Sequence, residues 1–113
     1  MRRGDILLIE FDPARPDEAN KVRPAIVVSN DGANRSAERQ GRGVISVLPV
    51  TSNVDRVYSF QVLIEDAGLR TASKVQTEQI RSVSISRVRR TIGRVPAATM
   101  AEVDRVLRVH LGL

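Results

Sequence analysis

Short apolar stretches rich in valine and isoleucine recur along the chain, separated by polar or glycine-containing segments. This spacing is typical of an antiparallel sheet or a small barrel. In residues 60–65, Phe, Val and Ile alternate with Gln and Leu, so we expect this strand to bury one face. The pattern predicts strands over residues 5–11, 25–29, 44–50, 60–65, 74–83 and 92–95.

The predicted strand over residues 74–83 is mixed and mostly polar, which favours an edge of the sheet or the wall of a cleft. Two long segments, 13–22 and 31–43, contain no apolar run. We expect both to be surface loops, and long loops on a rigid scaffold often carry function.

The end of the chain has a different period. Thr99 followed by Glu102 matches a capping box, which predicts the start of a helix. The apolar residues that then recur at helical spacing are Met100, Val103, Val106, Leu107 and Leu111. We therefore predict one amphipathic helix that ends near Gly112.

The chain has 113 residues, which fits a single domain over residues 1–113. Its 18 basic residues exceed its 13 acidic ones, and all but two of the basic residues are arginines. Arginine suits phosphate and carboxylate, so this bias favours a polyanionic or acidic partner, with an arginine-rich coding bias as the alternative. No stretch approaches the roughly 20 apolar residues of a membrane span, and we expect a cytoplasmic protein.

Few of the usual catalytic groups are present. The chain has no cysteine, which excludes a thiol nucleophile and disulfides, and its single histidine, His110, lies in the predicted helix. These absences disfavour a two-histidine ribonuclease and a Ser-His-Asp hydrolase. Acids near one another in the first half of the chain could hold Mg²⁺, but scattered loop acids are usually solvated. We therefore predict no metal site and no cofactor.

The remaining inventory of arginine, lysine and hydroxyl groups suits the stabilisation of a phosphoryl group. Pro24 disfavours a helical conformation of Arg23, so Arg23 should be extended at the mouth of a strand, and Lys21 would share its face. The same pattern also fits a merely solubilising strand entrance. Thr51 and Ser52 end a predicted strand, where hydroxyls can bind a phosphate oxygen or cap a turn.

Together these segments resemble the MazF/PemK family of toxin endoribonucleases from toxin–antitoxin modules. Order and spacing match over nearly the whole chain, except that Pro16 stands where the family usually has glycine in the first loop, which bears on substrate preference. The matching segments are GDILLIEFDP (4–13), Glu18, Lys21, RPAIVVS (23–29), LPVTS (48–52), EQIRSVSISRV (78–88) and IGRV (92–95).

The resemblance implies a mainly β fold, an SH3-like barrel of mostly antiparallel strands with a C-terminal helix, as in MazF-like and CcdB-like toxins. It implies a homodimer with an RNA groove across its interface, and an antitoxin whose disordered acidic segment binds that groove. It also implies metal-independent cleavage of single-stranded RNA, in which the 2′-hydroxyl attacks the adjacent phosphate and leaves a 2′,3′-cyclic phosphate and a 5′-hydroxyl end.

By position, Arg23 and Thr51 fall on the family's catalytic pair, and Glu18, Ser73 and Gln79 fall on groove positions. Free arginine is a cation at neutral pH, so we expect Arg23 to stabilise the charged transition state and Thr51 to bind a non-bridging oxygen. The other expected RNA contacts are Lys21, Ser52 and Arg81.

Phe11, Tyr58 and Phe60 are the only aromatic residues, too few for an extended stacking platform, so we expect base recognition to rest on arginine, glutamine and backbone groups. An acid-free run of arginines could follow the RNA backbone, meet an acidic antitoxin or form a solvated edge: Arg81, Arg87, Arg89, Arg90 and Arg94.

Two alternative functions remain open, a toxin of the same fold that binds a protein such as DNA gyrase, and a non-catalytic RNA-binding barrel.

Overall fold

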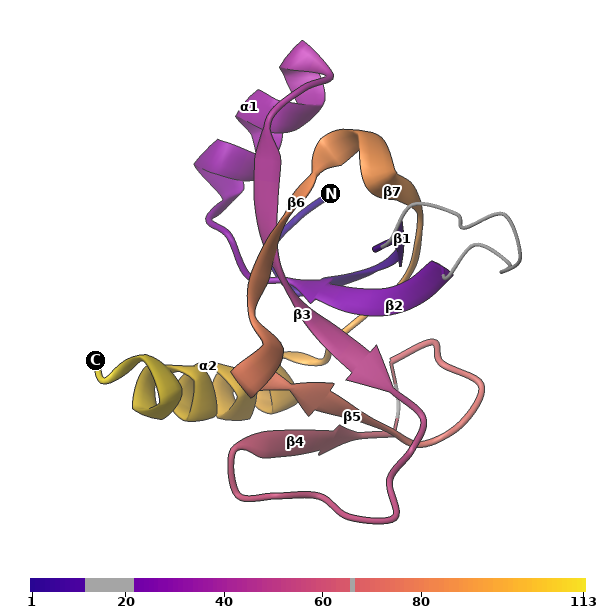
Figure 1. Ribbon diagram of the computed structural model, residues 1–113, viewed down its shortest axis with the longest axis vertical. Helices are drawn as coiled ribbons and strands as arrows, with labels where there is room; N and C mark the ends of the chain where they lie inside the picture. Colours follow the sequence, from indigo (N-terminus) through magenta and orange to yellow (C-terminus); the bar gives the residue numbers. More distant parts are fainter. Residues whose placement is uncertain (12–21, 66) are drawn as a thin grey trace.

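The computed structural model describes residues 1–11, 22–65 and 67–113. Their strands form one curved sheet, with one helix projecting at one end and a longer helix lying along the other (Figure 1). The elements are β1 (Asp5–Glu10), β2 (Val22–Val27), α1 (Asp31–Gln40), β3 (Val44–Thr51), β4 (Gln61–Ile64), β5 (Ser73–Gln76), β6 (Arg81–Ser84), β7 (Val88–Arg94) and α2 (Ala97–Leu111), with 3₁₀ turns η1 (Thr77–Gln79) and η2 (Ile85–Arg87).

The strand order is β4-β5-β3-β2-β1-β7, and β6 pairs with β3 beside this path. Each of these pairings is antiparallel, so the predicted mostly antiparallel β fold with a C-terminal helix is confirmed. Alternate residues of the central strands enter two buried clusters on opposite faces of the sheet. One is centred on Ile26, Leu48 and Val103 beneath α2, and the other on Leu7, Val27 and Val47.

The prediction of a single strand over residues 74–83 is wrong. The chain forms β5, turns through η1 and continues as β6. β5 pairs with Val50 and Thr51 at the end of β3, and β6 pairs with residues 44–47 at its start. The turn η1 lies between these two pairings, where the chain has more residues than β3 has partners for. Thr77 anchors the turn, because its fully buried hydroxyl donates to the carbonyl of Phe60.

The prediction of a loop over residues 31–43 is also wrong, since Asp31–Gln40 forms α1. Asn30 caps the helix by accepting a hydrogen bond from the Ala33 backbone N–H at 2.8 Å, and Gly41 ends it with φ +64°. The completely buried side chain of Asn34 donates to the carbonyl of Ser29 at 3.0 Å. This helix is stabilised by its two caps and one buried amide. It has no apolar stripe, which is the pattern that identifies a helix in a sequence, and the prediction therefore missed it.

The carboxylate of Asp31 provides a test of how α1 is attached to the rest of the protein. A hydrogen bond from the Arg3 backbone N–H, at 2.7 Å, lowers the pKa of Asp31 below its ordinary value of 3.8. A carboxyl with a depressed folded-state pKa stabilises the fold above its unfolded pKa and loses that contribution as pH falls through the folded value. We therefore expect Asp31→Asn to be less stable than the parent at pH 7, and this gap in unfolding free energy to close as pH falls below 3.8. Urea unfolding of both proteins at pH 7 and at acid pH measures it, and a gap unchanged by pH would contradict the assignment.

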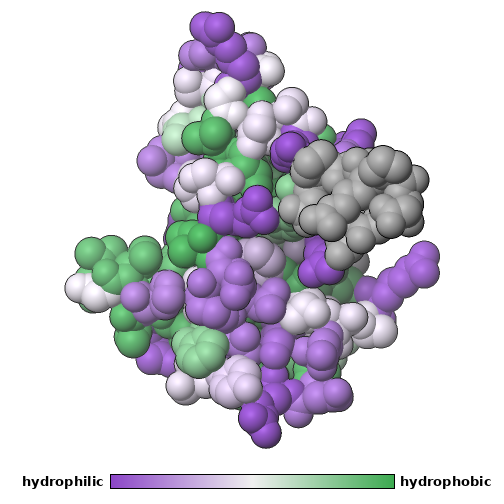
Figure 2. Space-filling model, in the orientation of Figure 1, coloured by the Kyte–Doolittle hydropathy of each residue, from purple (hydrophilic) through white to green (hydrophobic). Residues whose placement is uncertain are grey.

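The predicted C-terminal helix is present as α2, but the predicted capping box is wrong. The helix begins at Ala97 without a side-chain cap, so Thr99 lies inside the first turn, and Glu102 pairs with Arg105 at 2.6 Å instead. Helix α2 ends at Gly112. Its apolar face packs on the sheet, whereas apolar side chains near its C-terminal end stay exposed (Figure 2). No helix in the described parts of the chain is long and apolar enough to cross a membrane.

Candidate functional site

The register of the sheet brings Arg23 and Thr51 together. β2 and β3 pair Ala25 with Pro49, and Arg23 and Thr51, each two residues beyond that last pair, line one groove. β5 pairs Lys74 with Thr51 on the other side of β3. Every second residue of a strand points to the same face, so Arg23 shares the face of Ala25, and Thr51 shares that of Pro49 and Lys74. The side chains of Arg23, Thr51 and Lys74 thus form a row on one face of β2, β3 and β5.

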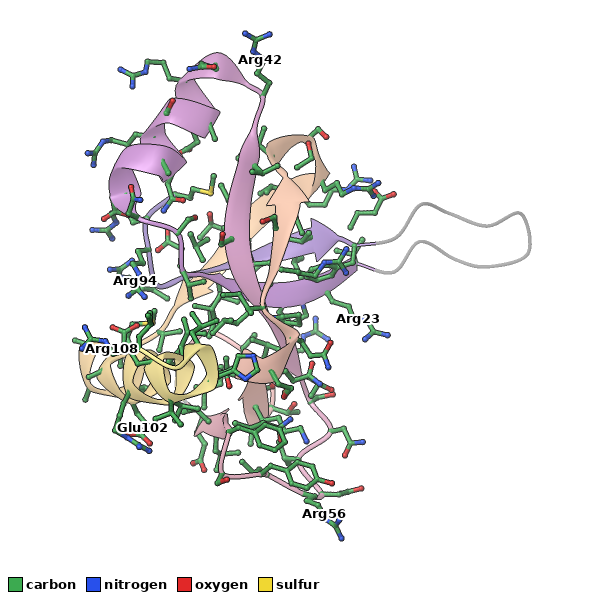
Figure 3. All side chains as sticks on the ribbon, turned by 60° about the vertical axis from the view of Figure 1, so that its left-hand side comes forward. Arg23, Arg42, Arg56, Arg94, Glu102 and Arg108 are labelled. Atoms are coloured by element: carbon green, nitrogen blue, oxygen red, sulfur yellow. The ribbon has the colours of Figure 1, made fainter. Side chains whose placement is uncertain are left out.

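A groove of about 400 Å³ lies at the ends of these strands; we call it the strand-end groove. The connection that leads into β5 forms its other wall, and Figure 3 shows Arg23 extending outward from β2. Four of the residues predicted from the sequence to carry function thus share one groove with neighbours that were not predicted. Its lining consists of Arg23, Pro24, Val50, Thr51, Ser52, Leu69, Arg70, Thr71 and Ser73.

A second groove, of about 230 Å³, continues on the same face of the sheet, and we call it the sheet-face groove. It contains the predicted Gln79 and Arg81, and the guanidinium carbon of Arg81 lies 4.9 Å from the ring centroid of Phe11, which positions it by a cation–π contact. Arg23 lines both grooves and forms the boundary between them. The lining consists of Phe11, Arg23, Pro49, Gln76, Gln79 and Arg81.

The hydroxyl of Thr51 is oriented by its own turn. Its Oγ1 accepts a hydrogen bond from the Asn53 backbone N–H at 3.2 Å, so the turn-capping role considered from the sequence is present. A hydroxyl that accepts one bond keeps its proton available to donate, which suits contact with an anionic oxygen. Ser73 differs, because it is 4% exposed and its hydroxyl donates to the Thr71 carbonyl at 3.1 Å, so it supports the groove wall. Ser52 is exposed.

The described lining of the two grooves is cationic. It includes Arg23, Arg70 and Arg81 and contains no carboxylate. The arginines of the acid-free run have different surroundings. Arg81 lines the sheet-face groove. Arg89 forms an ion pair with Glu10, and Arg94 forms one with Asp5, at the two ends of β1. The arginines that the structure describes here therefore attract a phosphate chain.

Sequence reasoning missed the parts of the site that come from the β4–β5 connection. Arg70 and Thr71 precede Ser73 by only a few residues, so pairing β5 with the end of β3 would have placed them near Thr51. The predicted Glu18 and Lys21, like the departure at Pro16, lie outside the described residues. Within residues 1–11, 22–65 and 67–113, no three histidine or carboxylate side chains gather as metal ligands.

Fold and sequence together place the chain among the toxins of type II toxin–antitoxin systems. Within that class it belongs to the family of PemK-like, MazF-like toxins, whose model matches residues 2–111. The family resemblance drawn from the sequence motifs is thereby confirmed.

Relatives match along most of their length. Endoribonuclease MazF9 of Mycobacterium tuberculosis is 56% identical over 115 residues, which cover 100% of this chain and 98% of that protein. Endoribonuclease PemK of Escherichia coli is 33% identical over 91% of this chain and 76% of its own length. A chain of the MazE–MazF crystal structure (form II) from Deinococcus radiodurans has a TM-score of 0.78 at 27% identity, covering 100% of this chain and 96% of that one.

Proposed function

We propose that this toxin is a sequence-specific endoribonuclease that cleaves single-stranded RNA without a metal ion and thereby inhibits translation and growth. The observation that supports it is that Arg23 from β2 and Thr51 from β3 line one groove, whose described lining contains arginines and no carboxylate. The full-length relatives at 56% and 33% identity, both named endoribonucleases, support the same activity.

In the proposed reaction the nucleophile belongs to the substrate. The ribose 2′-oxygen attacks the adjacent phosphorus and loses its proton to solvent, while the bond from phosphorus to the 5′-oxygen breaks and that oxygen takes up a proton. Arg23 stabilises the extra negative charge on the pentacovalent phosphorus and donates a hydrogen bond to the leaving oxygen, and Thr51 donates to a non-bridging oxygen. The products are a 2′,3′-cyclic phosphate and a 5′-hydroxyl end.

The activity is tested by incubating the purified protein with long RNA in EDTA and mapping the new ends. We expect cuts that leave 5′-hydroxyl ends, and we expect a single 2′-deoxynucleotide at a mapped site to abolish that cut alone. Ends with a 5′-phosphate, or a requirement for Mg²⁺, would contradict the mechanism. Binding of RNA that stays intact would instead identify a non-catalytic RNA-binding barrel.

Thr51→Val should lower kcat/KM for RNA by about 10²-fold, because it removes one donor to the developing charge. Thr51→Ser keeps the hydroxyl and should stay within about tenfold of the parent. Single-turnover cleavage of one mapped oligonucleotide measures both variants. Equal losses in the two variants would contradict the assigned role of the hydroxyl, because only Thr51→Val removes it.

We further propose that the toxin acts in the cytoplasm as a homodimer and is inhibited by an antitoxin with an acidic segment. The net charge of +5 and the cationic grooves favour such a partner. The similar fold in the MazE–MazF crystal structure supports the assignment. Sedimentation should give twice the chain mass of 12.5 kDa, and an acidic peptide that occupies the groove should block cleavage.

A further inference from the structure

An exposed aromatic pair lies on the connection between β3 and β4. The rings of Tyr58 and Phe60 are stacked, with centroids 5.1 Å apart and planes 4° apart, although the two residues are 44% and 40% exposed. Two cations flank Tyr58: the guanidinium carbon of Arg56 lies 5.7 Å from its ring centroid and the ammonium of Lys74 lies 5.8 Å from it. In Figure 3 Arg56 marks this end of the molecule, opposite Arg42.

The pair is held in place by the surrounding structure. The Lys74 ammonium donates to the Arg56 carbonyl at 2.6 Å, and the Lys74 residue is only 8% exposed. Tyr58 exchanges hydrogen bonds with Gln61, whose backbone N–H donates to the Tyr58 carbonyl at 2.9 Å. These bonds order the rings in advance, which reduces the entropy cost of binding a ligand on them.

The aromatic pair is joined to the proposed catalytic row. Lys74 is the direct partner of Thr51 in the register of β3 and β5, one strand spacing of about 5 Å away. Because Lys74 and Thr51 point to the same face of the sheet, the ring above Lys74 stands on the face that carries Arg23 and Thr51. The pairing of Thr51 with Lys74 and the contact of Lys74 with Tyr58 thus connect the strand-end groove to the aromatic pair.

We infer that Tyr58 and Phe60, with Arg56 beside them, form a base-stacking subsite for one nucleotide that flanks the cleaved phosphate, an inference that rests on the proposed ribonuclease function. Exposed aromatic rings beside cations are the combination that binds single-stranded nucleic acid, because bases stack on the rings while the cations contact phosphates. Three aromatic residues are too few for an extended platform, yet two of them adjacent on one ordered connection suffice for a single base. The subsite adds base contacts outside the grooves.

Intrinsic fluorescence tests the stacking without requiring cleavage, because Tyr58 is the only tyrosine and the chain has no tryptophan. A mixed-sequence single-stranded oligodeoxynucleotide lacks the 2′-hydroxyl and stays intact during titration. We expect it to quench Tyr58 fluorescence with saturation, and an abasic oligonucleotide of the same length to leave the signal nearly unchanged. Absence of quenching, or equal quenching by the abasic strand, would overturn the subsite.

Kinetics on a mapped RNA oligonucleotide give the second test. Tyr58→Ala should raise KM about 5- to 100-fold, the loss expected for one stacked base, with kcat within about threefold of the parent. Tyr58→Phe keeps the ring and should recover most of the affinity that Tyr58→Ala loses. Val44→Ala changes an exposed apolar residue at the opposite end of β3 and should match the parent. Thermal melting by circular dichroism confirms that the variants fold.

The outcomes separate the two hypotheses. A parent protein that leaves RNA intact contradicts the proposed function, while the fluorescence titration still decides whether bases stack on Tyr58. A parent that cuts RNA with an unchanged Tyr58→Ala variant overturns the subsite alone. If Tyr58→Ala instead converts a dimer to a monomer in sedimentation, the aromatic pair is a contact between two copies of the chain, and the subsite is also overturned.

Discussion

Replacing Arg23 with alanine should lower kcat/KM for RNA cleavage by about 10³-fold or more, the size of effect that an arginine contributes to a charged phosphoryl transition state. Arg23 lines both grooves and extends from the sheet (Figure 3), so its guanidinium reaches the space where a phosphate would lie. The side chain is exposed, and its loss should leave the fold intact. Single-turnover cleavage by parent and variant measures the effect, with circular dichroism as the check on folding.

Two further variants show whether charge or geometry is responsible. Arg23→Lys keeps a positive charge but loses the planar fork of donors, so it should recover only part of the lost rate. Arg42→Ala removes another exposed arginine, at the end of the molecule opposite Arg56, and should cleave like the parent. If Arg23→Ala and Arg42→Ala both stay within about tenfold of the parent, the proposed role of Arg23 is wrong.

Gly93→Ala should destabilise the protein by about 3 kcal/mol or prevent folding, because it forces an overlap between two backbone segments. The connection between β4 and β5 crosses β7 at this point, and a Cβ on Gly93 would lie 1.9 Å from the carbonyl oxygen of Ala67. The neighbouring Gly68 has φ +83° and also lies against the backbone of β7. The atoms that would overlap belong to the backbone of β7 and of the β4–β5 connection, and not to a flexible side chain. Relieving the overlap would therefore require the two backbone segments to separate.

Urea unfolding measures the loss, with Gly32→Ala as the matched control. A Cβ on Gly32 would meet only the side-chain oxygen of Asn30, at 3.2 Å, and that side chain can shift. We therefore expect the control to change the unfolding free energy by less than about 1 kcal/mol. A Gly93→Ala variant as stable as this control would contradict the close packing at β7.

Elements with a repeating apolar pattern were predictable. The strand around Val62 and the helix around Val103 have their buried residues at the period of two or of about four that burial on one face requires. The strands around Ile26 and Leu48 are buried on both faces, and continuous apolar runs indicated them. Helix α1 was not predictable from such a pattern, because Asn34 and Ala37 are its only buried residues. Its signals were Asn30 and Gly41 at its two ends, which are also common in loops.

The candidate site divides in the same way. Pro24 favours an extended Arg23, and the resemblance to the family motifs assigns roles to Arg23 and Thr51, so the amino-acid sequence is sufficient to propose both residues as candidates. The contributions of Arg70 and of the Tyr58–Phe60 pair are not identifiable in this way, because they depend on which strands pair and on where two connections lie.

By itself, the sequence determined the apolar runs that form the buried strands, the C-terminal helix and the residue types available for chemistry, since each depends on neighbouring positions in the chain. Only the tertiary structure decided that Thr51 pairs with Lys74 and shares a groove with Arg23, that η1 interrupts the strand predicted over residues 74–83, and that Gly93 must be glycine. Register and close packing are set by contacts between residues far apart in the chain, and a local pattern contains no information about which distant strand will supply the partner.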